Sequence, residues 1–122
     1  MATPTSTTAQ GRWGEQAAAS YLRSAGHRIL QKNYKRITGE VDIISMDGEV
    51  IVCTEVKTWF GVPCEDLERA ISRTKQRRIA ATAAVFLLEF PRYAGCAVRF
   101  DVILIGRDTG LVHFADAFQG AG

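Results

Sequence analysis

The sequence predicts a single α/β domain in which a mixed β-sheet is flanked by helices. The chain has 122 residues, 47% of them hydrophobic, which suits one core and leaves too little length for a second domain. Two stretches have helical periodicity, and the segments between and after them have the composition of strands. The resulting order, helix, three strands, helix, two strands, gives a mixed sheet with helices covering its faces.

The first predicted element is a helix over residues 10–25, since small and apolar residues recur there at helical spacing until Gly26 ends the pattern. Residues 1–9 are rich in Ser and Thr and are expected to be a disordered tail. The folded domain is therefore expected to comprise residues 10–122.

A strand is predicted over residues 27–35, and a second helix begins at about Glu65 or at Ser72. That helix ends at Glu89, because Pro91 cannot continue it. The last two strands are expected over residues 97–105 and 111–118.

The most informative segment is a β-hairpin formed by residues 40–45 and 50–57 around an Asp-Gly turn at 47–48. A two-residue loop at this turn predicts that Asp42 lies opposite Cys53. Side chains two apart share a face, so Glu55 becomes the diagonal neighbour of Asp42, and Lys57 follows on the same face. In this register Glu40 would lie directly opposite Glu55, where like charges repel.

This face suggests the chemistry of phosphodiester cleavage. Asp42 and Glu55, about 7 to 8 Å apart in such a diagonal arrangement, can share one Mg²⁺ or Mn²⁺ as its metal ligands. Lys57 is then placed to orient the attacking water or to stabilise charge on the phosphate. Glu15 adds a further carboxylate if the first helix crosses the hairpin. The alternative is a solvent-exposed network of ion pairs without chemistry.

The net charge is only +2, but basic residues gather on both sides of the acidic hairpin. Positive flanks around an acidic centre suit a polyanion such as nucleic acid. The alternative is that these are solvated helix faces. The candidate nucleic-acid contacts are Arg12, Arg73, Lys75, Arg77 and Arg78.

Several other functions are disfavoured by the sequence. No stretch approaches the length of a membrane span, and the N-terminal residues lack the apolar core of a signal peptide. Cys53, Cys64 and Cys96 form neither a CxxC pair nor an even set, so a disulfide framework is not expected. The expected location is the reducing cytoplasm. His27 and His113 stand alone in the sequence and are assigned no role, whereas Arg99 and Asp101 share a strand face and can pair with each other.

The motifs of this chain resemble the YraN family of uncharacterised bacterial proteins, which is related to archaeal Holliday-junction resolvases and restriction-endonuclease-like nucleases. The segments that carry the resemblance are residues 11–15, 39–44, 55–57, Lys75 and 99–102. Trp59 departs from the family pattern, which usually has a basic residue there, and this weakens the expected phosphate contact.

The resemblance implies a restriction-endonuclease-like mixed sheet with Glu15, Asp42, Glu55 and Lys57 as the active-site set. The implied activity is a Mg²⁺-dependent endonuclease that acts on branched or otherwise structured DNA. A two-fold homodimer is expected if two strands are cut symmetrically. The alternative is a nucleic-acid-binding or scaffold protein of the same fold without efficient turnover.

Overall fold

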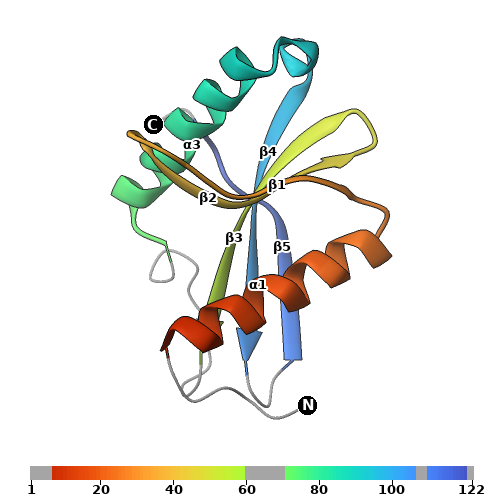
Figure 1. The fold of residues 1–122 in the computed structure, drawn as a ribbon, viewed down its shortest axis with the longest axis vertical. Coiled ribbons are helices and arrows are strands. Elements are labelled where there is room, and N and C mark those ends of the chain that lie inside the picture. Colours follow the sequence, from red (N-terminus) through yellow and green to blue (C-terminus); the bar gives the residue numbers. More distant parts are fainter. Residues whose placement is uncertain (1–6, 60–70, 107–109, 121–122) are drawn as a thin grey trace.

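The computed structural model describes residues 7–59, 71–106 and 110–120, which form a five-stranded sheet with helices packed against it (Figure 1). Over these residues the predicted order of helices and strands is confirmed, with a short 3₁₀-helix added before the fourth strand. The elements are α1 (Thr7–Ser24), β1 (Arg28–Arg36), β2 (Gly39–Asp47), β3 (Val50–Trp59), α3 (Arg73–Glu89), the 3₁₀-helix (Pro91–Tyr93), β4 (Ala97–Gly106) and β5 (Gly110–Phe118).

The strands lie in the sheet in their sequence order. β3 and β4 are parallel, while the three other neighbouring pairs are antiparallel, so the sheet is mixed as predicted. Parallel neighbours need a long crossover, and α3 lies in the connection between β3 and β4. This α/β arrangement is consistent with a restriction-endonuclease-like fold.

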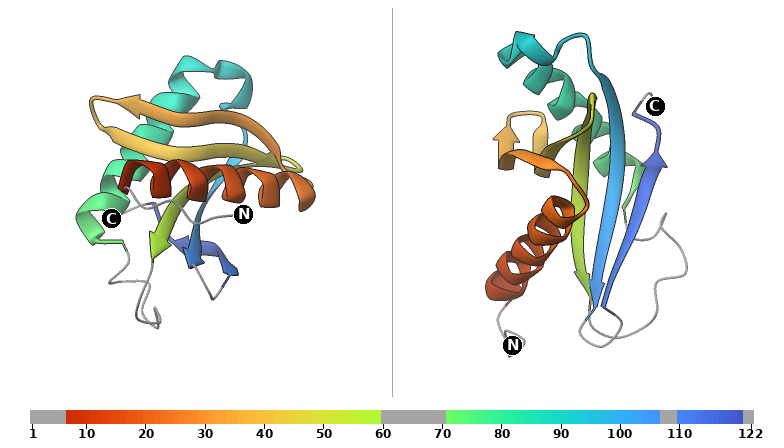
Figure 2. Two further views of the ribbon diagram at one scale, coloured as in Figure 1. Left: turned by 60° about the horizontal axis from the view of Figure 1, so that its bottom comes forward. Right: turned by 90° about the vertical axis from the view of Figure 1, so that its right-hand side faces the viewer.

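The core has two main parts, one under each helix. α1 packs through Leu22 on a cluster that includes Ile43 of β2, and Figure 2 shows this helix lying along the sheet. α3 packs through Phe86 on a second cluster that includes Ile44 and Cys53. Neighbouring residues of β2 therefore enter different cores, as the alternation of side chains along a strand requires.

α1 approaches β3 very closely at Gly14. A Cβ atom at this position would lie 2.1 Å from Cγ2 of Thr58, far inside van der Waals contact. The absence of a side chain at this position lets the helix rest on the strand without displacing Thr58. The close approach also fixes the position of the next helical residue, Glu15.

The ends of the two helices differ from the prediction in different ways. α1 begins at Thr7, three residues earlier than expected, and residues 1–6 lie outside the described residues. α3 begins after Ser72, the second of the two predicted starts, because the Ser72 hydroxyl accepts a hydrogen bond from the backbone N–H of Lys75 at 3.1 Å.

The predicted register of the β2–β3 hairpin is wrong. The loop residues are Gly48 and Glu49, and Asp47 is the last paired residue of β2. Gly48 has a φ of 61°, and glycine at the first loop position with positive φ is typical of a type II′ hairpin. Cys53 consequently pairs with Ile44 and not with Asp42.

Because the register moves by two residues, every side chain keeps its predicted face. Continuing the observed pairing would bring Asp42 opposite Glu55, so the predicted opposition of Glu40 and Glu55 is also wrong.

Cys53 is buried and Cys96 is half-buried, both as free thiols, while Cys64 lies outside the described residues. Within the described ranges, none of the helices is long and apolar enough to cross a membrane.

Candidate active site

The candidate site lies where β2 separates from β3. The last backbone pair between these strands is Ile43 with Thr54, and beyond it the carboxylate of Asp42 accepts the N–H of Val56 at 2.8 Å. A side-chain oxygen thus replaces the backbone carbonyl that a continuing ladder would provide. On the other side of β2, Asn33 of β1 has a φ of 53°, in the left-handed region.

The separation of the strands leaves a cleft of about 380 Å³ between the fork and the first turns of α3. Asp42 and Glu55 both face this cleft, so the structure brings together the two carboxylates predicted to share one face. The residues that line the cleft are Gly39, Glu40, Asp42, Glu55, Ser72, Thr74, Lys75, Arg78 and Ile79.

The two walls of the cleft are joined by side-chain contacts between the β1–β2 turn and α3. The hydroxyl groups of Thr38 and Thr82 lie 2.7 Å apart, and Nη2 of Arg36 donates to Oε2 of Glu89 at 2.9 Å. A Cβ atom at Gly39 would lie only 3.1 Å from the Arg78 side chain. The hairpin and the helix therefore pack together as one unit.

The carboxylates of Asp42 and Glu55 lie close enough in the cleft for their negative charges to repel each other. Glu55 is only 4% exposed, and one of its oxygens lies 2.6 Å from Nζ of Lys75. Burial, followed by the negative charge of Glu55, raises the pKa of Asp42, and the charge of Glu15 acts in the same direction. The positive charge of Lys75 opposes this rise without cancelling it. An additional cation in the cleft would therefore stabilise the ionised pair.

Asp42 and Glu55 offer the hard oxygen atoms that Mg²⁺ or Mn²⁺ requires. Among the described residues, no group of three or more His, Cys, Asp or Glu side chains is arranged to hold a metal. Two protein carboxylates nevertheless fit Mg²⁺, because this ion usually keeps several waters and binds substrate phosphate alongside one or two carboxylates. The donor set thus fits a metal whose remaining ligands are water and phosphate.

The other predicted site residues lie around this cleft at different depths. Lys57 is exposed on β3, two residues beyond Glu55, and does not line the cleft. Glu15 is half-buried on α1 and also lies outside the cleft lining, although its charge influences Asp42. The side chain of Trp59 lies outside the described part of the structure.

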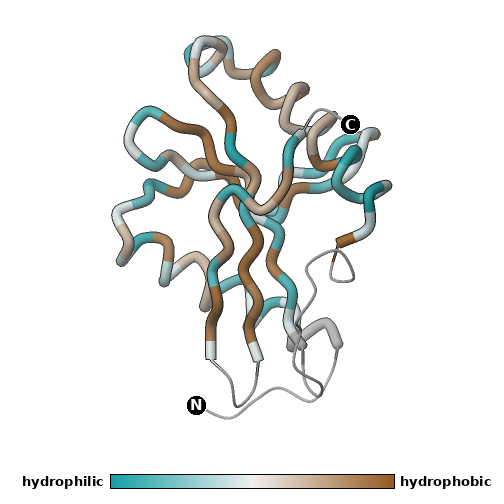
Figure 3. The backbone as a smooth tube through the Cα atoms, turned by 180° about the vertical axis from the view of Figure 1, so that it is seen from behind, coloured by the Kyte–Doolittle hydropathy of each residue, from teal (hydrophilic) through white to brown (hydrophobic). Residues whose placement is uncertain are grey.

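The predicted nucleic-acid contacts are all exposed. Arg12 lies on α1, and the four others occupy the first turns of α3, which form a hydrophilic segment in Figure 3. Arg78 and Lys75 line the cleft directly. Lys75 therefore points towards the site.

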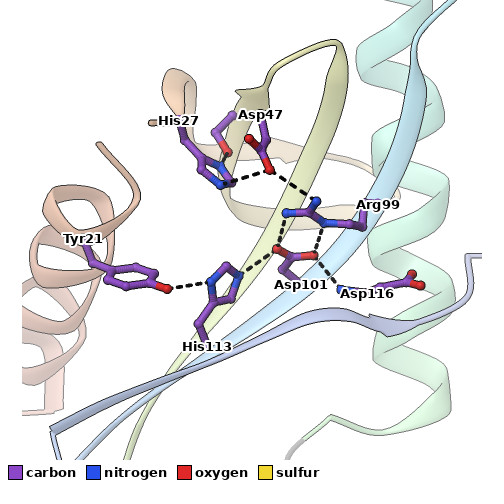
Figure 4. Close-up of polar contacts among 8 residues, drawn as sticks. Tyr21, His27, Asp47, Arg99, Asp101, His113 and Asp116 are labelled. Atoms are coloured by element: carbon purple, nitrogen blue, oxygen red, sulfur yellow. Dashed lines mark hydrogen bonds and ion pairs between the residues drawn. The ribbon is translucent and has the colours of Figure 1, made fainter. Parts of the chain in front are cut away.

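A second polar cluster, on the α1 side of the sheet, is centred on Asp101 of β4 (Figure 4). Asp101 is completely buried and accepts hydrogen bonds from Nε and Nη2 of Arg99, at 2.9 and 3.0 Å. The predicted pairing of these two residues is confirmed. Nε2 of His113 lies 2.7 Å from Asp101, and the backbone N–H of Asp116 donates to it at 2.9 Å. Burial raises the pKa of Asp101, but the hydrogen bonds outweigh it and hold the pKa below its usual value.

The two histidines, although isolated in the sequence, both belong to this polar cluster. Nδ1 of His113 lies 2.9 Å from the Tyr21 hydroxyl of α1, and Nδ1 of His27 lies 2.9 Å from the Ser45 hydroxyl. The carboxylate of Asp47 bridges His27, at 3.7 Å, to Arg99. The cluster joins α1 and His27, which precedes β1, to three strands, β2, β4 and β5. Its members are too far apart in the sequence for local spacing to reveal it.

Comparison with known proteins gives a consistent family assignment. The model of the uncharacterised protein family UPF0102 matches residues 14–105. A UPF0102 protein of Treponema pallidum (strain Nichols) is 37% identical over 115 residues, covering 89% of this chain and 91% of its own. UPF0102 proteins of Frankia casuarinae and Rhodococcus opacus are 41% and 40% identical over 114 residues, each alignment covering 90% of this chain and 96% of the relative. The resemblance carried by the motifs is thus confirmed, and the chain belongs to the uncharacterised protein family UPF0102, the YraN family.

Proposed function

We propose that this protein is a metal-dependent endonuclease that hydrolyses phosphodiester bonds in nucleic acid. The observation that carries the proposal is the convergence of Asp42 and Glu55 in one cleft whose rim is formed by the basic first turns of α3. The carboxylate oxygens of Asp42 and Glu55 are suitable ligands for a divalent cation, and the positive charge at the rim is suited to binding the phosphate backbone.

Each group in the cleft has a definite task in this proposal. Asp42 and Glu55 would hold Mg²⁺ or Mn²⁺, which when bound activates water and neutralises phosphate charge. The N–H of Val56 fixes one oxygen of Asp42 and leaves the other free to face the cleft. Lys75 and Arg78 lie where they can contact a phosphate. Lys57, exposed beyond the fork, reaches the reaction only when its long side chain turns towards the bound substrate.

We further propose branched or structured DNA as the substrate, cut by a two-fold dimer. Support for this finer assignment comes from the motifs shared with the resolvase-related family. Symmetrical cleavage of two strands needs two sites, and a dimer would supply them as the same acidic cleft on each of its two protomers.

Cleavage of a labelled four-way junction and of linear duplex DNA, with Mg²⁺ or Mn²⁺, tests the proposal. Isosteric Asp42→Asn and Glu55→Gln should abolish product formation, because each removes a metal-binding charge while keeping the side-chain shape. Glu49→Gln is the matched control, since Glu49 is exposed in the hairpin loop and should retain wild-type activity. Activity that persists in both cleft variants would refute the assignment.

The exposed position of Lys57 favours a second candidate, a nucleic-acid-binding protein without efficient turnover. The lysine expected to assist hydrolysis does not line the cleft that contains the acidic pair. This candidate predicts binding of the junction with no cleavage in either metal. A cleavage rate that falls in Lys57→Ala and stays unchanged in Lys32→Ala, a control at another exposed strand lysine, would exclude it.

A further inference from the structure

We propose that Lys75 is an internal counter-ion of the acidic pair and that a divalent cation binds only by displacing it from Glu55. This inference rests on the proposed function, because it assigns the same cleft to a metal. The Lys75 ammonium lies 2.6 Å from Oε1 of Glu55, a charge-assisted contact that occupies one of the two oxygens this carboxylate could offer to a metal.

Glu55 depends on this partner. Its side chain is only 4% exposed, so water can solvate the carboxylate poorly, and an ionised carboxylate in such a place needs a positive neighbour. Asp42 and Glu40 line the same cleft, so the ammonium lies among three acidic side chains. A metal ion and the ammonium cannot share one oxygen of Glu55, and with the metal on the other oxygen the two cations would lie close enough to repel each other strongly.

Lys75 is able to leave without disturbing the fold. Its side chain is 47% exposed and ends a flexible four-carbon stem, so the ammonium can turn out to solvent. Its backbone is held independently, because the N–H of Lys75 donates to the Ser72 hydroxyl at 3.1 Å. The pair can therefore open while the first turn of α3 remains intact.

Calorimetric titration of the protein with MgCl₂ or MnCl₂, without nucleic acid, tests the proposal. Lys75→Met should tighten metal binding about tenfold, since a charge-assisted hydrogen bond to Glu55 no longer competes. Lys75→Arg should weaken it, because a guanidinium grips a carboxylate with two parallel hydrogen bonds. Arg78→Met also removes one positive charge from the cleft and controls for that loss of charge alone. Its metal affinity is expected to rise only about twofold.

The order of affinities decides the outcome. The proposal is supported if metal affinity is highest for Lys75→Met, intermediate for the wild type and lowest for Lys75→Arg, and if Arg78→Met binds metal nearly as the wild type does. Equal effects of Lys75→Met and Arg78→Met would overturn it, since charge alone would then explain both. Lys75→Gln, neutral and of similar length, replaces Lys75→Met if circular dichroism shows that the latter is unfolded.

The two proposals fail separately. Metal-dependent cleavage that requires Glu55, without the predicted affinity order, would refute the role of Lys75 and leave the endonuclease assignment standing. The predicted affinity order without cleavage would support the role of Lys75 and refute the endonuclease assignment. Absence of metal binding in the wild type and in every Lys75 variant would overturn both.

Discussion

The contact between Gly14 and Thr58 makes a quantitative prediction about how α1 is held on the sheet. Replacing glycine by alanine inside a helix usually stabilises it by about 1 kcal/mol. At Gly11 the new methyl group would meet no other atom within 4 Å, so Gly11→Ala should be about 0.5 to 1 kcal/mol more stable than the wild type.

At Gly14 the same methyl group would lie 2.1 Å from Cγ2 of Thr58. Overpacking of this kind costs about 1 to 3 kcal/mol, which exceeds or cancels the gain in helix propensity. Gly14→Ala should therefore be neutral to about 2 kcal/mol less stable, and the two alanine variants should differ by about 1 to 3 kcal/mol. Urea denaturation followed by circular dichroism measures both free energies of unfolding.

A second substitution identifies the clashing atom. Thr58→Ser removes Cγ2, after which the nearest atoms to the new methyl group are Cβ of residue 58 at 3.6 Å and Cγ1 of Val56 at 3.8 Å, both ordinary contacts. Thr58→Ser should thus rescue most of the stability lost in Gly14→Ala, with a coupling energy of about 1 kcal/mol or more in the double-mutant cycle. Equal stability of Gly11→Ala and Gly14→Ala, or absence of rescue, would refute the close approach of α1 to β3.

Two further predictions concern titratable groups. Folding raises the pKa of Asp42, so ionising this carboxyl as the pH rises above 3.8 costs the folded state stability. Asp42→Asn cannot ionise and can still accept the Val56 N–H. At pH 8 in EDTA its free energy of unfolding, measured by urea denaturation, should exceed that of the wild type by about 1 kcal/mol or more. An Asn variant less stable than wild type would contradict this. Folding lowers the pKa of His27, mainly because burial disfavours the charged ring. The stability that neutral His27 contributes is therefore complete above pH 6.5 and is lost as the pH falls from 6.5 towards the lowered pKa. Between pH 7.5 and 5.5 the thermal unfolding midpoint should fall further for the wild type than for His27→Gln. Equal losses would exclude His27 as the source.

The order of elements could be predicted because it depends on local patterns. Helical spacing identified α1 and α3, and the Asp-Gly dipeptide identified the β2–β3 hairpin, although not its register. Register was missed because Gly48 takes the first loop position, while the side chain of Asp47 is used in distant contacts with Arg99 and His27. A one-dimensional pattern contains no information on such partners.

The candidate site was predictable in part for the same reason. Alternation along strands placed Asp42 and Glu55 on one face, and an even change of register left that result intact. The fork itself was not predicted, since it involves a side-chain carboxylate that replaces a backbone acceptor, which no local pattern reveals. The distance between Lys75 and Glu55 likewise follows from the packing of α3 on the sheet, a long-range contact.

The ties between the β1–β2 turn and α3 have a consequence for how any substrate reaches the cleft. Because Thr38 contacts Thr82, and Arg36 pairs with Glu89, the two walls are braced against each other and cannot spread without breaking these contacts. Packed interfaces of this kind resist small deformations. The cleft would therefore keep its shape, and a nucleic acid of the kind proposed above would have to adapt to it to bring a phosphate near Glu55. Selection between substrates would then be made by the ease with which each substrate deforms, and not by closure of the protein around it.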